Sequence, residues 1–260
     1  MKKIISYLSV SVLLCFSFIN AFAYKPTQQW YELKIYHCNK NEQLTVVHQF
    51  LKESFLPLLH NKGYKNIGVF TAIDADTAVD KKIVVFIPLK NIEEVAAIDK
   101  IFYETSFINQ QSNYLTAAYN QAVYQRIETV VLKAFRFMQT MQLPNLTSPK
   151  AERVYELRSY EGATEKLYNK KVEMFNEGGE INIFSHLNFN AVFYAEVIAG
   201  SHMPNLMYMT THNNKAERDE HWKNFGADTT WKRISNLPEY KNTVSHSDIL
   251  FLRPTEYSDF

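Results

Sequence analysis

Two segments of the chain alternate apolar and polar side chains in the manner of β-strands. Residues 30–36 read WYELKIY and residues 154–160 read VYELRSY, so each segment places alternate residues on opposite faces of a strand. The two segments share the letters YEL, with Tyr31 and Tyr155 lying 124 residues apart. A repeat over about half of the chain indicates two related structural units.

The same succession of patterns follows each strand-like segment. Apolar residues spaced three and four apart predict a helix over residues 42–60, with Gly63 as its stop. The elements predicted next in the first half are strands over 67–73 and 82–89, a helix opened by a capping box at Asn91 and Glu94, a helical stretch over 114–124 and a strand over 126–137.

The second half repeats this order of elements. Its first helix is indicated by the stripe Tyr168, Val172 and Phe175, and the two glycines at 178–179 favour its end. The elements predicted next are strands over 190–198 and 206–212, a helix over 215–225, a short helix capped by Asp228 and a strand over 244–252.

The order strand, helix, strand, strand, helix, strand is that of a ferredoxin-like α+β module, whose helices cover one face of an antiparallel sheet. The other face of each sheet carries Tyr and aliphatic residues and favours burial. We therefore predict two ferredoxin-like modules, residues 24–142 and 151–260, joined by a linker over 143–150 and packed as a pseudo-dimeric α+β barrel. The alternative is that each open face pairs with another chain, which would give a homo-oligomer.

The first 23 residues have the pattern of a secretory signal peptide. Two lysines at 2–3 precede an uncharged, mostly apolar stretch over 4–19, and Ala-Phe-Ala at 21–23 matches a cleavage site. The alternatives are a membrane anchor, for which the apolar stretch is short, and a lipoprotein processed at Cys15, which the large preceding leucine disfavours. The pattern predicts an exported protein, periplasmic or extracellular, with no stable membrane anchor after cleavage.

Composition narrows the function classes. The chain has 28 Lys and Arg against 27 Asp and Glu, so its charge gives no case for binding nucleic acid. Its seven glycines spell neither a GxGxxG motif nor a P-loop, which excludes those two nucleotide-binding loops. Its two cysteines are too few for a disulfide scaffold or a zinc ribbon.

Two stretches of the second half resemble the NIPSNAP family. Residues 154–162, VYELRSYEG, resemble the strand that opens a NIPSNAP domain. Residues 218–231, in the pattern R-x3-W-x2-F-x2-D-x2-W, are similar to the second-helix signature of that family. The resemblance covers residues 153–252, whereas the first half has Lys34 in place of the arginine and lacks the tryptophan run.

This resemblance implies a ferredoxin-like fold of the dimeric α+β-barrel type. It does not imply a reaction, because one fold carries many activities. NIPSNAP proteins are known in animals as interaction and signalling proteins, and the broader superfamily includes monooxygenases and haem-degrading enzymes. The family therefore suggests a fold more firmly than a function.

The charged residues of the two matching strands are the main candidates for a ligand site. Glu32 with Lys34, and Glu156 with Arg158, are two residues apart, so each pair shares one sheet face, which we assign to the face away from the helices. There the two pairs would form a charged floor of an inter-sheet cavity, with Arg158 binding a carboxylate or phosphate. The alternative is that they are ion pairs that fix the register of the sheets. The candidate ligand-binding set is completed by three residues of the second half, Tyr160, Tyr208 and His212.

Histidines and aspartates are the other candidates for chemistry. His186, His202 and His212 lie near the ends of the second and third strands of the second half, where they would serve as haem or metal ligands or as a general base at the cavity mouth. The alternative is that they are solvated loop histidines. The aspartates at 74, 76 and 80 lack the glycine and distal glutamate of a calcium loop and are interpreted as a solvated turn. We predict no metal site.

These observations predict a protein that binds a small ligand or a protein partner through the inter-sheet cavity or its surface. The alternative is a cofactor-poor monooxygenase or isomerase in which Glu156 or a nearby histidine is the base and Arg158 holds an anion. No cofactor is predicted, with haem handling as the minor alternative. The sequence names neither a ligand nor a catalytic residue.

Overall fold

The computed structural model describes residues 27–74, 77–104 and 113–260, so the predicted signal peptide over 1–23 lies outside the described residues. Within those ranges, no helix combines the length and the apolar character that crossing a membrane requires. The first module consists of β1 (Trp30–Cys38), α1 (Asn41–Phe50), the π-helical turn η1 (Leu51–Phe55), α2 (Leu56–Asn61), β2 (Gly68–Ala72), β3 (Lys81–Leu89), α3 (Glu93–Ile101) and β4 (Arg126–Ala134).

The second module repeats the plan with more helices. It consists of β5 (Val154–Glu161), α5 (Glu165–Asn176), α6 (Glu180–His186), β6 (Phe193–Ala199), β7 (Asn205–His212), α7 (Lys215–Ala227), α8 (Thr229–Ile234), the 3-10 turn η2 (Pro238–Tyr240) and β8 (His246–Pro254). Asp228 accepts the backbone N–H of Trp231 at 2.8 Å, which confirms it as the predicted N-cap of the short helix.

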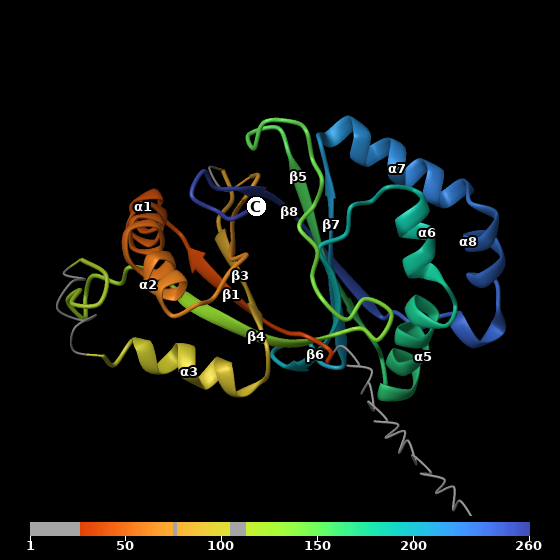
Figure 1. Cartoon of the computed structure of the whole chain (residues 1–260), viewed down its shortest axis with the longest axis horizontal. Helices are drawn as coiled ribbons and strands as arrows, with labels where there is room; N and C mark the ends of the chain where they lie inside the picture. The colour runs from red at the N-terminus through yellow and green to blue at the C-terminus, as the bar shows by residue number, and fades with distance from the viewer. Residues whose placement is uncertain (1–26, 75–76, 105–112) are drawn as a thin grey trace, which may run out of the picture.

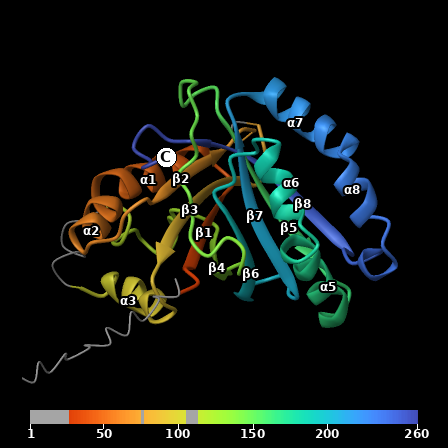
Figure 2. The same cartoon turned by 45° about the vertical axis from the view of Figure 1, so that its right-hand side comes forward.

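The eight strands close into one barrel in the order β1-β3-β2-β8-β5-β7-β6-β4. Each module contributes four antiparallel neighbours, and the modules join where β2 pairs with β8 and β4 pairs with β6. Helices α1–α3 cover the barrel on one side and α5–α8 on the other (Figures 1 and 2). The predicted pseudo-dimeric α+β barrel is confirmed, and both open sheet faces are buried within one chain.

Aromatic rings from both modules fill one end of the barrel interior. The rings of Tyr31 on β1, Phe86 on β3 and Phe193 on β6 contact one another, with centroids 5.0–5.4 Å apart. Phe260 packs against Phe70 and Tyr155 at 5.4 Å and 6.1 Å. Large rings at these separations remove much apolar area from water and stabilise the interface between the modules.

One predicted helix is wrong. Residues 114–124 consist of turns, bends and irregular backbone. Tyr114 stacks on Phe50 of α1 with a centroid distance of 3.7 Å, and Tyr124 meets Tyr36 of β1 edge-on at 5.9 Å. Tyr114 and Tyr124 therefore make two separate contacts from an irregular segment, and their spacing does not indicate one face of a helix. The sequence also missed α6, which begins directly after Gly179.

Asn214 caps the helix that covers the second sheet. Its side-chain oxygen accepts the Glu217 N–H at 2.9 Å, and the Glu217 carboxylate accepts the Asn213 N–H at 2.7 Å. Because these bonds satisfy donors at the start of α7, Asn214→Ala is expected to lower the free energy of unfolding by about 1 kcal/mol. Urea unfolding measures the change. Asn145→Ala, at an exposed position outside any helix, is the control, and an equal loss in both variants would contradict the capping role.

Candidate functional site

The strand alternation predicted from sequence is correct, but the predicted face is inverted. Tyr31 and Tyr155 point into the barrel, where they contact Phe86 and Phe70. The charged residues that alternate with the inward-pointing residues of β1 and β5 point outward, beneath the helices. The prediction that Glu32, Lys34, Glu156 and Arg158 form the floor of the inter-sheet cavity is therefore wrong, because Glu156 finds its partners on α7 outside the barrel and Glu32 pairs with Lys34 on the same outer face.

Glu156 is the centre of a buried charge cluster between β5 and α7. Its carboxylate accepts hydrogen bonds from Arg218 at 2.7 Å and 2.9 Å, from Arg158 Nε at 2.6 Å and from Trp222 Nε1 at 2.9 Å. Burial alone would raise the pKa of the Glu156 carboxyl, but these donors and the two guanidinium charges hold it below its usual range. The cluster explains why α7 carries an arginine and a tryptophan four residues apart: both reach the same carboxylate.

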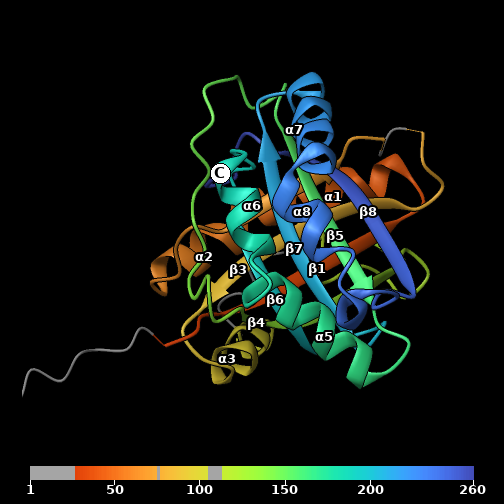
Figure 3. The same ribbon diagram turned by 90° about the vertical axis from the view of Figure 1, so that its right-hand side faces the viewer.

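The remaining candidates of the second half lie in the same helix-covered layer, seen from outside in Figure 3. Arg158 donates to the Tyr160 hydroxyl at 2.9 Å, and Tyr160 and Tyr208 share a hydrogen bond at 2.9 Å. His212 is fully buried, with its Nδ1 2.9 Å from Nδ1 of His221. Burial lowers the pKa of His212 to about 3. The prediction of His212 at a cavity mouth is therefore wrong, since it lies under α7.

Glu32 and Lys34 form a separate ion pair of 2.8 Å in the first module. The Lys34 ammonium lies 5.9 Å from the centre of the Phe102 ring, just beyond the end of α3. Burial raises the pKa of the Glu32 carboxyl, with the Lys34 charge acting in the opposite direction. The seven candidates thus occupy two helix-covered layers on opposite sides of the barrel, and ligand binding by them stays a prediction.

One cavity of the described structure lies inside the other end of the barrel, away from the cluster of aromatic rings. It has a volume of about 240 Å³. Its floor is apolar, formed by Ile35, Val130, Leu157, Met207 and Leu250. Its rim is polar and comes from both modules, with His37, Lys82, Arg126 and Glu128 from the first and Ser159, Asn205, His202 and Asp248 from the second. We call this the barrel-mouth cavity.

The strand registers show that the two halves of this rim occupy equivalent positions. In the first module His37 is paired with Lys82 and Arg126. In the second module Glu161, the counterpart of His37, is paired with Asn205 and His246. Two residues earlier on the same strands, Ile35 is paired with Glu128 and Ser159 with Asp248, so Glu128 and Asp248 are also counterparts. The strand pairing is the same in both modules, but the residues at the paired positions differ. The first half of the rim carries two permanent cations, Lys82 and Arg126, and the second half carries none among these positions.

His37 presents a buried ring nitrogen to the cavity. The residue is 4% exposed, and its Nδ1 lies 2.9 Å from both carboxylate oxygens of Asp80. Because a carboxylate only accepts, we assign the ring proton to Nδ1. Nε2 then has no hydrogen-bond partner in the described structure and lies 3.5 Å from the Glu128 carboxylate. Asp80 lies in an exposed turn, as interpreted from the sequence, and its carboxylate also orients this ring, while residue 76 lies outside the described residues.

Glu128 links the rim of the first module to the loop between β6 and β7. It accepts a hydrogen bond from the Ser201 hydroxyl and pairs with Arg126 at 3.4 Å. Partial burial would raise the pKa of the Glu128 carboxyl, but Ser201, Arg126 and His37 together lower it. The carboxylate is therefore ionised at neutral pH beside the free nitrogen of His37.

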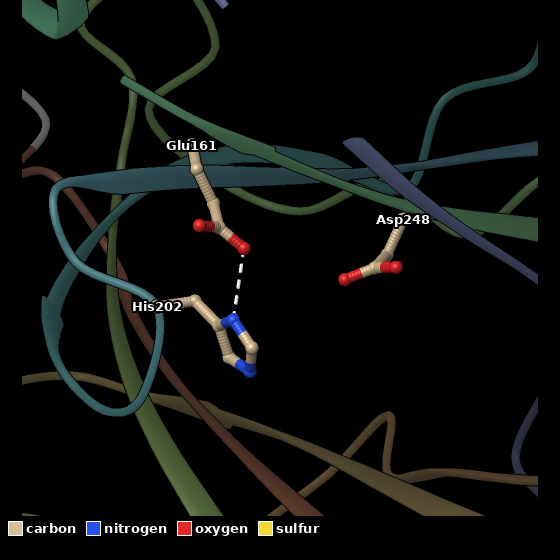
Figure 4. Close-up of side chains that lie close together, drawn as sticks. All are labelled: Glu161, His202 and Asp248. Atoms are coloured by element: carbon tan, nitrogen blue, oxygen red, sulfur yellow. Dashed lines mark hydrogen bonds and ion pairs between the residues drawn. The ribbon is translucent and has the colours of Figure 1, made fainter. Parts of the chain in front are cut away.

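Two side chains of the second half of the rim, His202 and Asp248, meet the neighbouring Glu161. His202 Nδ1 lies 2.8 Å from the Glu161 carboxylate, and Asp248 faces both (Figure 4). One donor atom from each of the three residues lies within 4.8 Å of the others. His202 is a residue that sequence reasoning weighed as a metal ligand at a cavity mouth, and it does line the mouth. His37, Glu128, Glu161 and Asp248 were missed, although counting in steps of two from Tyr31 and Tyr155 reaches His37 and Glu161.

Comparison with known proteins agrees with this fold. The family model described as NIPSNAP matches residues 155–259, so the second module carries a NIPSNAP domain. No curated protein matches the chain significantly.

Solved structures resemble either the whole chain or one module. A protein provisionally assigned as a monooxygenase from Lactobacillus acidophilus NCFM has a TM-score of 0.56 and 10% identity, over 87% of this chain and 94% of that one. A protein of the same provisional assignment from Fusobacterium nucleatum has a TM-score of 0.56 and 10% identity, over 88% and 93%. A NIPSNAP family protein from Agrobacterium tumefaciens has 20% identity and a TM-score of 0.36, over 41% of this chain and 97% of that one. The two longer matches show the barrel fold alone.

Proposed function

On the premise that the second module carries a NIPSNAP domain, we propose that this chain is an exported protein that binds a small organic molecule in the barrel-mouth cavity. The observation that carries the proposal is the His37 Nε2 atom, which is buried, without a hydrogen-bond partner in the described structure, and part of the cavity wall. A buried acceptor left unsatisfied costs about 1–3 kcal/mol, and a ligand that donates to it removes that cost. Export is supported by the basic, apolar and Ala-Phe-Ala pattern of residues 1–23.

The size and lining of the cavity define the ligand class. A dry apolar cavity of about 150 Å³ accommodates benzene, so the volume of about 240 Å³ suits a single ring with one or two substituents. The apolar floor of Ile35, Leu157 and Met207 favours the ring. His37 Nε2, the ring nitrogen that carries no proton in the tautomer assigned from Asp80, accepts a hydrogen bond, so the ligand presents a hydroxyl group. We therefore propose a small hydroxylated ring compound.

The proposal is tested with 4-methylphenol and toluene, which differ by the hydroxyl group alone. Calorimetric titration is expected to show preferential binding of 4-methylphenol, and His37→Phe is expected to reduce that preference about tenfold, the equivalent of one hydrogen bond. Asp80→Asn, at a half-exposed position, weakens the orientation of the ring without opening a hole in the barrel. His60→Phe is the control, because His60 pairs with Asp259 away from this cavity. Equal affinity for both compounds in the unmodified protein would refute the proposal.

A second candidate function, proton abstraction, is favoured by the same histidine and aspartate. A ring with Nδ1 held by Asp80 and Nε2 free toward a ligand is the arrangement of a general base. His37 Nε2 would take a proton from an acidic C–H or O–H group, leaving the ligand as an enolate or phenolate that regains a proton at another atom. Exchange of ligand C–H protons with deuterated water, lost in His37→Gln, tests this isomerase-type step. Binding without exchange would leave the binding function alone.

A further inference from the structure

Glu161, His202 and Asp248 come together from three separate elements, and the last two line the rim of the barrel-mouth cavity. Glu161 ends β5, His202 lies in the loop between β6 and β7, and Asp248 lies near the start of β8. Figure 4 shows the two carboxylates and the imidazole turned toward one another. Their donor atoms lie within 4.8 Å of one another. Because the three residues are far apart in the sequence, they come together only when the strands of the second module pair.

The charges around this group are unbalanced, in contrast to the first half of the rim. There, Asp80 lies 3.5 Å from Lys82, and Glu128 lies 3.4 Å from Arg126. In the described part of the chain, the ion-pair partners of Glu161 and Asp248 are the histidines 202 and 246, at 2.8 Å and 3.3 Å. Two carboxylates this close repel each other unless a cation lies between them. Among the described residues, no lysine or arginine pairs with these two carboxylates, so a bound cation would offset their repulsion.

We infer that Glu161, His202 and Asp248 bind a divalent transition metal, with zinc the best match, at the rim of the barrel-mouth cavity. One imidazole and two carboxylates are donors that zinc accepts, whereas calcium and magnesium prefer sites made of oxygen alone. Zinc binds such donors at about 2.0–2.2 Å, which places tetrahedral donors roughly 3.4 Å from one another, whereas the three donors here lie within 4.8 Å of one another. His202 and Asp248 side chains are 54% and 62% exposed, so rotation of the side chains is sufficient to close the site.

The neighbouring residues complete the case. His246 holds one oxygen of Asp248 at 3.3 Å, which is the kind of second contact that orients a metal-binding carboxylate. Three protein donors leave the fourth position of a tetrahedral zinc open. Across the same cavity, the buried Nε2 of His37 has no hydrogen-bond partner within the described ranges and accepts from whatever donor occupies the space. A water molecule or a ligand hydroxyl on the metal is such a donor.

The test is zinc titration of the untagged mature protein by calorimetry, with cobalt as a spectroscopic probe. We expect one zinc ion per chain, a visible cobalt absorption typical of a low-coordinate site, and at least about a tenfold loss of zinc affinity in His202→Ala and in Asp248→Asn. The matched control is His186→Ala. His186 is 54% exposed, as His202 is, and pairs with a single carboxylate, Asp228, at 3.0 Å. That variant is expected to bind zinc as the unmodified protein does.

Two outcomes would overturn the inference: no saturable zinc binding, or equal affinity in His202→Ala and His186→Ala. The result is separable from that of the proposed ligand-binding function. His37→Phe is expected to reduce the preference for 4-methylphenol while zinc binding persists, whereas His202→Ala is expected to weaken zinc binding by at least about tenfold while the folded protein keeps its His37–Asp80 pair. Circular dichroism of each variant establishes that the loss is local. If zinc does not bind but 4-methylphenol does, the ligand-binding function stands and the metal site does not.

Discussion

Replacing Glu156 with alanine is expected to lower the free energy of unfolding by about 3–5 kcal/mol. The carboxylate is fully buried and accepts hydrogen bonds from Arg158, Arg218 and Trp222. Removing it leaves two guanidinium groups and an indole N–H without their acceptor beneath α7. The two positive charges then repel each other in a site of low polarity, so the loss exceeds that of an ordinary hydrogen bond.

Urea or guanidinium unfolding followed by circular dichroism measures the effect. Glu220→Ala, at an exposed position on the same helix, is the control and is expected to change stability by less than about 0.5 kcal/mol. The double variant Glu156→Ala with Arg218→Ala should be more stable than the sum of the two single losses predicts, because it removes one of the stranded charges. Additive losses would show that the cluster does not act as a unit.

The two-module architecture was predictable because it rests on a repeat. The matching YEL segments begin β1 and β5, which occupy equivalent places in the barrel and pair with equivalent neighbours. Local patterns placed most strands and helices within a few residues. They failed at residues 114–124, where the spacing of Tyr114 and Tyr124 is set by contacts with Phe50 and Tyr36. Spacing alone cannot distinguish a helical stripe from two separate anchors.

The face of each strand was assigned wrongly for a physical reason. Alternation shows which residues share a face, but in a barrel covered by helices both faces are buried. The charged face lies where partners exist, and for Glu156 these are Arg218 and Trp222 on α7. The four-residue spacing of those two residues was visible in the sequence as a pair of donors on one side of a helix. Matching them to Glu156 would have given the correct orientation.

The barrel-mouth cavity was beyond sequence reasoning because its rim forms only when the barrel closes. His37, Glu128, Glu161 and Asp248 lie on four different strands. Their sequence neighbours give no motif, and their relation follows from the strand registers that pair His37 with Arg126 and Glu161 with His246. The pseudo-symmetry of the repeat is what makes them comparable. Two divergent modules can thus place different sets of polar residues on the two halves of one barrel mouth.

Lowering the pH from 7.5 to 5 is expected to reduce the free energy of unfolding by about 2 kcal/mol through His212 alone. Burial lowers the pKa of His212 to about 3 in the folded protein, against about 6.5 in the unfolded chain. Between these values the unfolded state binds a proton that the folded state does not. The stabilising contribution is therefore present above pH 6.5 and is lost at about 1.4 kcal/mol per pH unit as the pH falls toward 3.

The groups that face His212 set the limits of this window. Arg218 and Arg158 keep their charge throughout and oppose protonation, whereas the Glu156 carboxylate favours it. Since the pKa of the Glu156 carboxyl is lowered, its own contribution is lost as the pH falls from the ordinary glutamate value, about 4.3, toward the lower folded-state value, so a comparison of pH 7.5 with pH 5 largely avoids it. Burial also lowers the pKa of His48, which adds a loss of the same sign in the same window.

Urea unfolding of the unmodified protein and of His212→Gln at both pH values isolates the contribution of His212 to the pH dependence of stability. His212→Gln should be less stable at pH 7.5, because the contact with His221 is lost, but its stability should fall by about 2 kcal/mol less between the two pH values. His186→Gln, an exposed histidine paired with Asp228, is the control and should retain the full dependence. An identical pH dependence in His212→Gln and the unmodified protein would mean that His212 accepts a proton in the folded state, with the layer beneath α7 open to water.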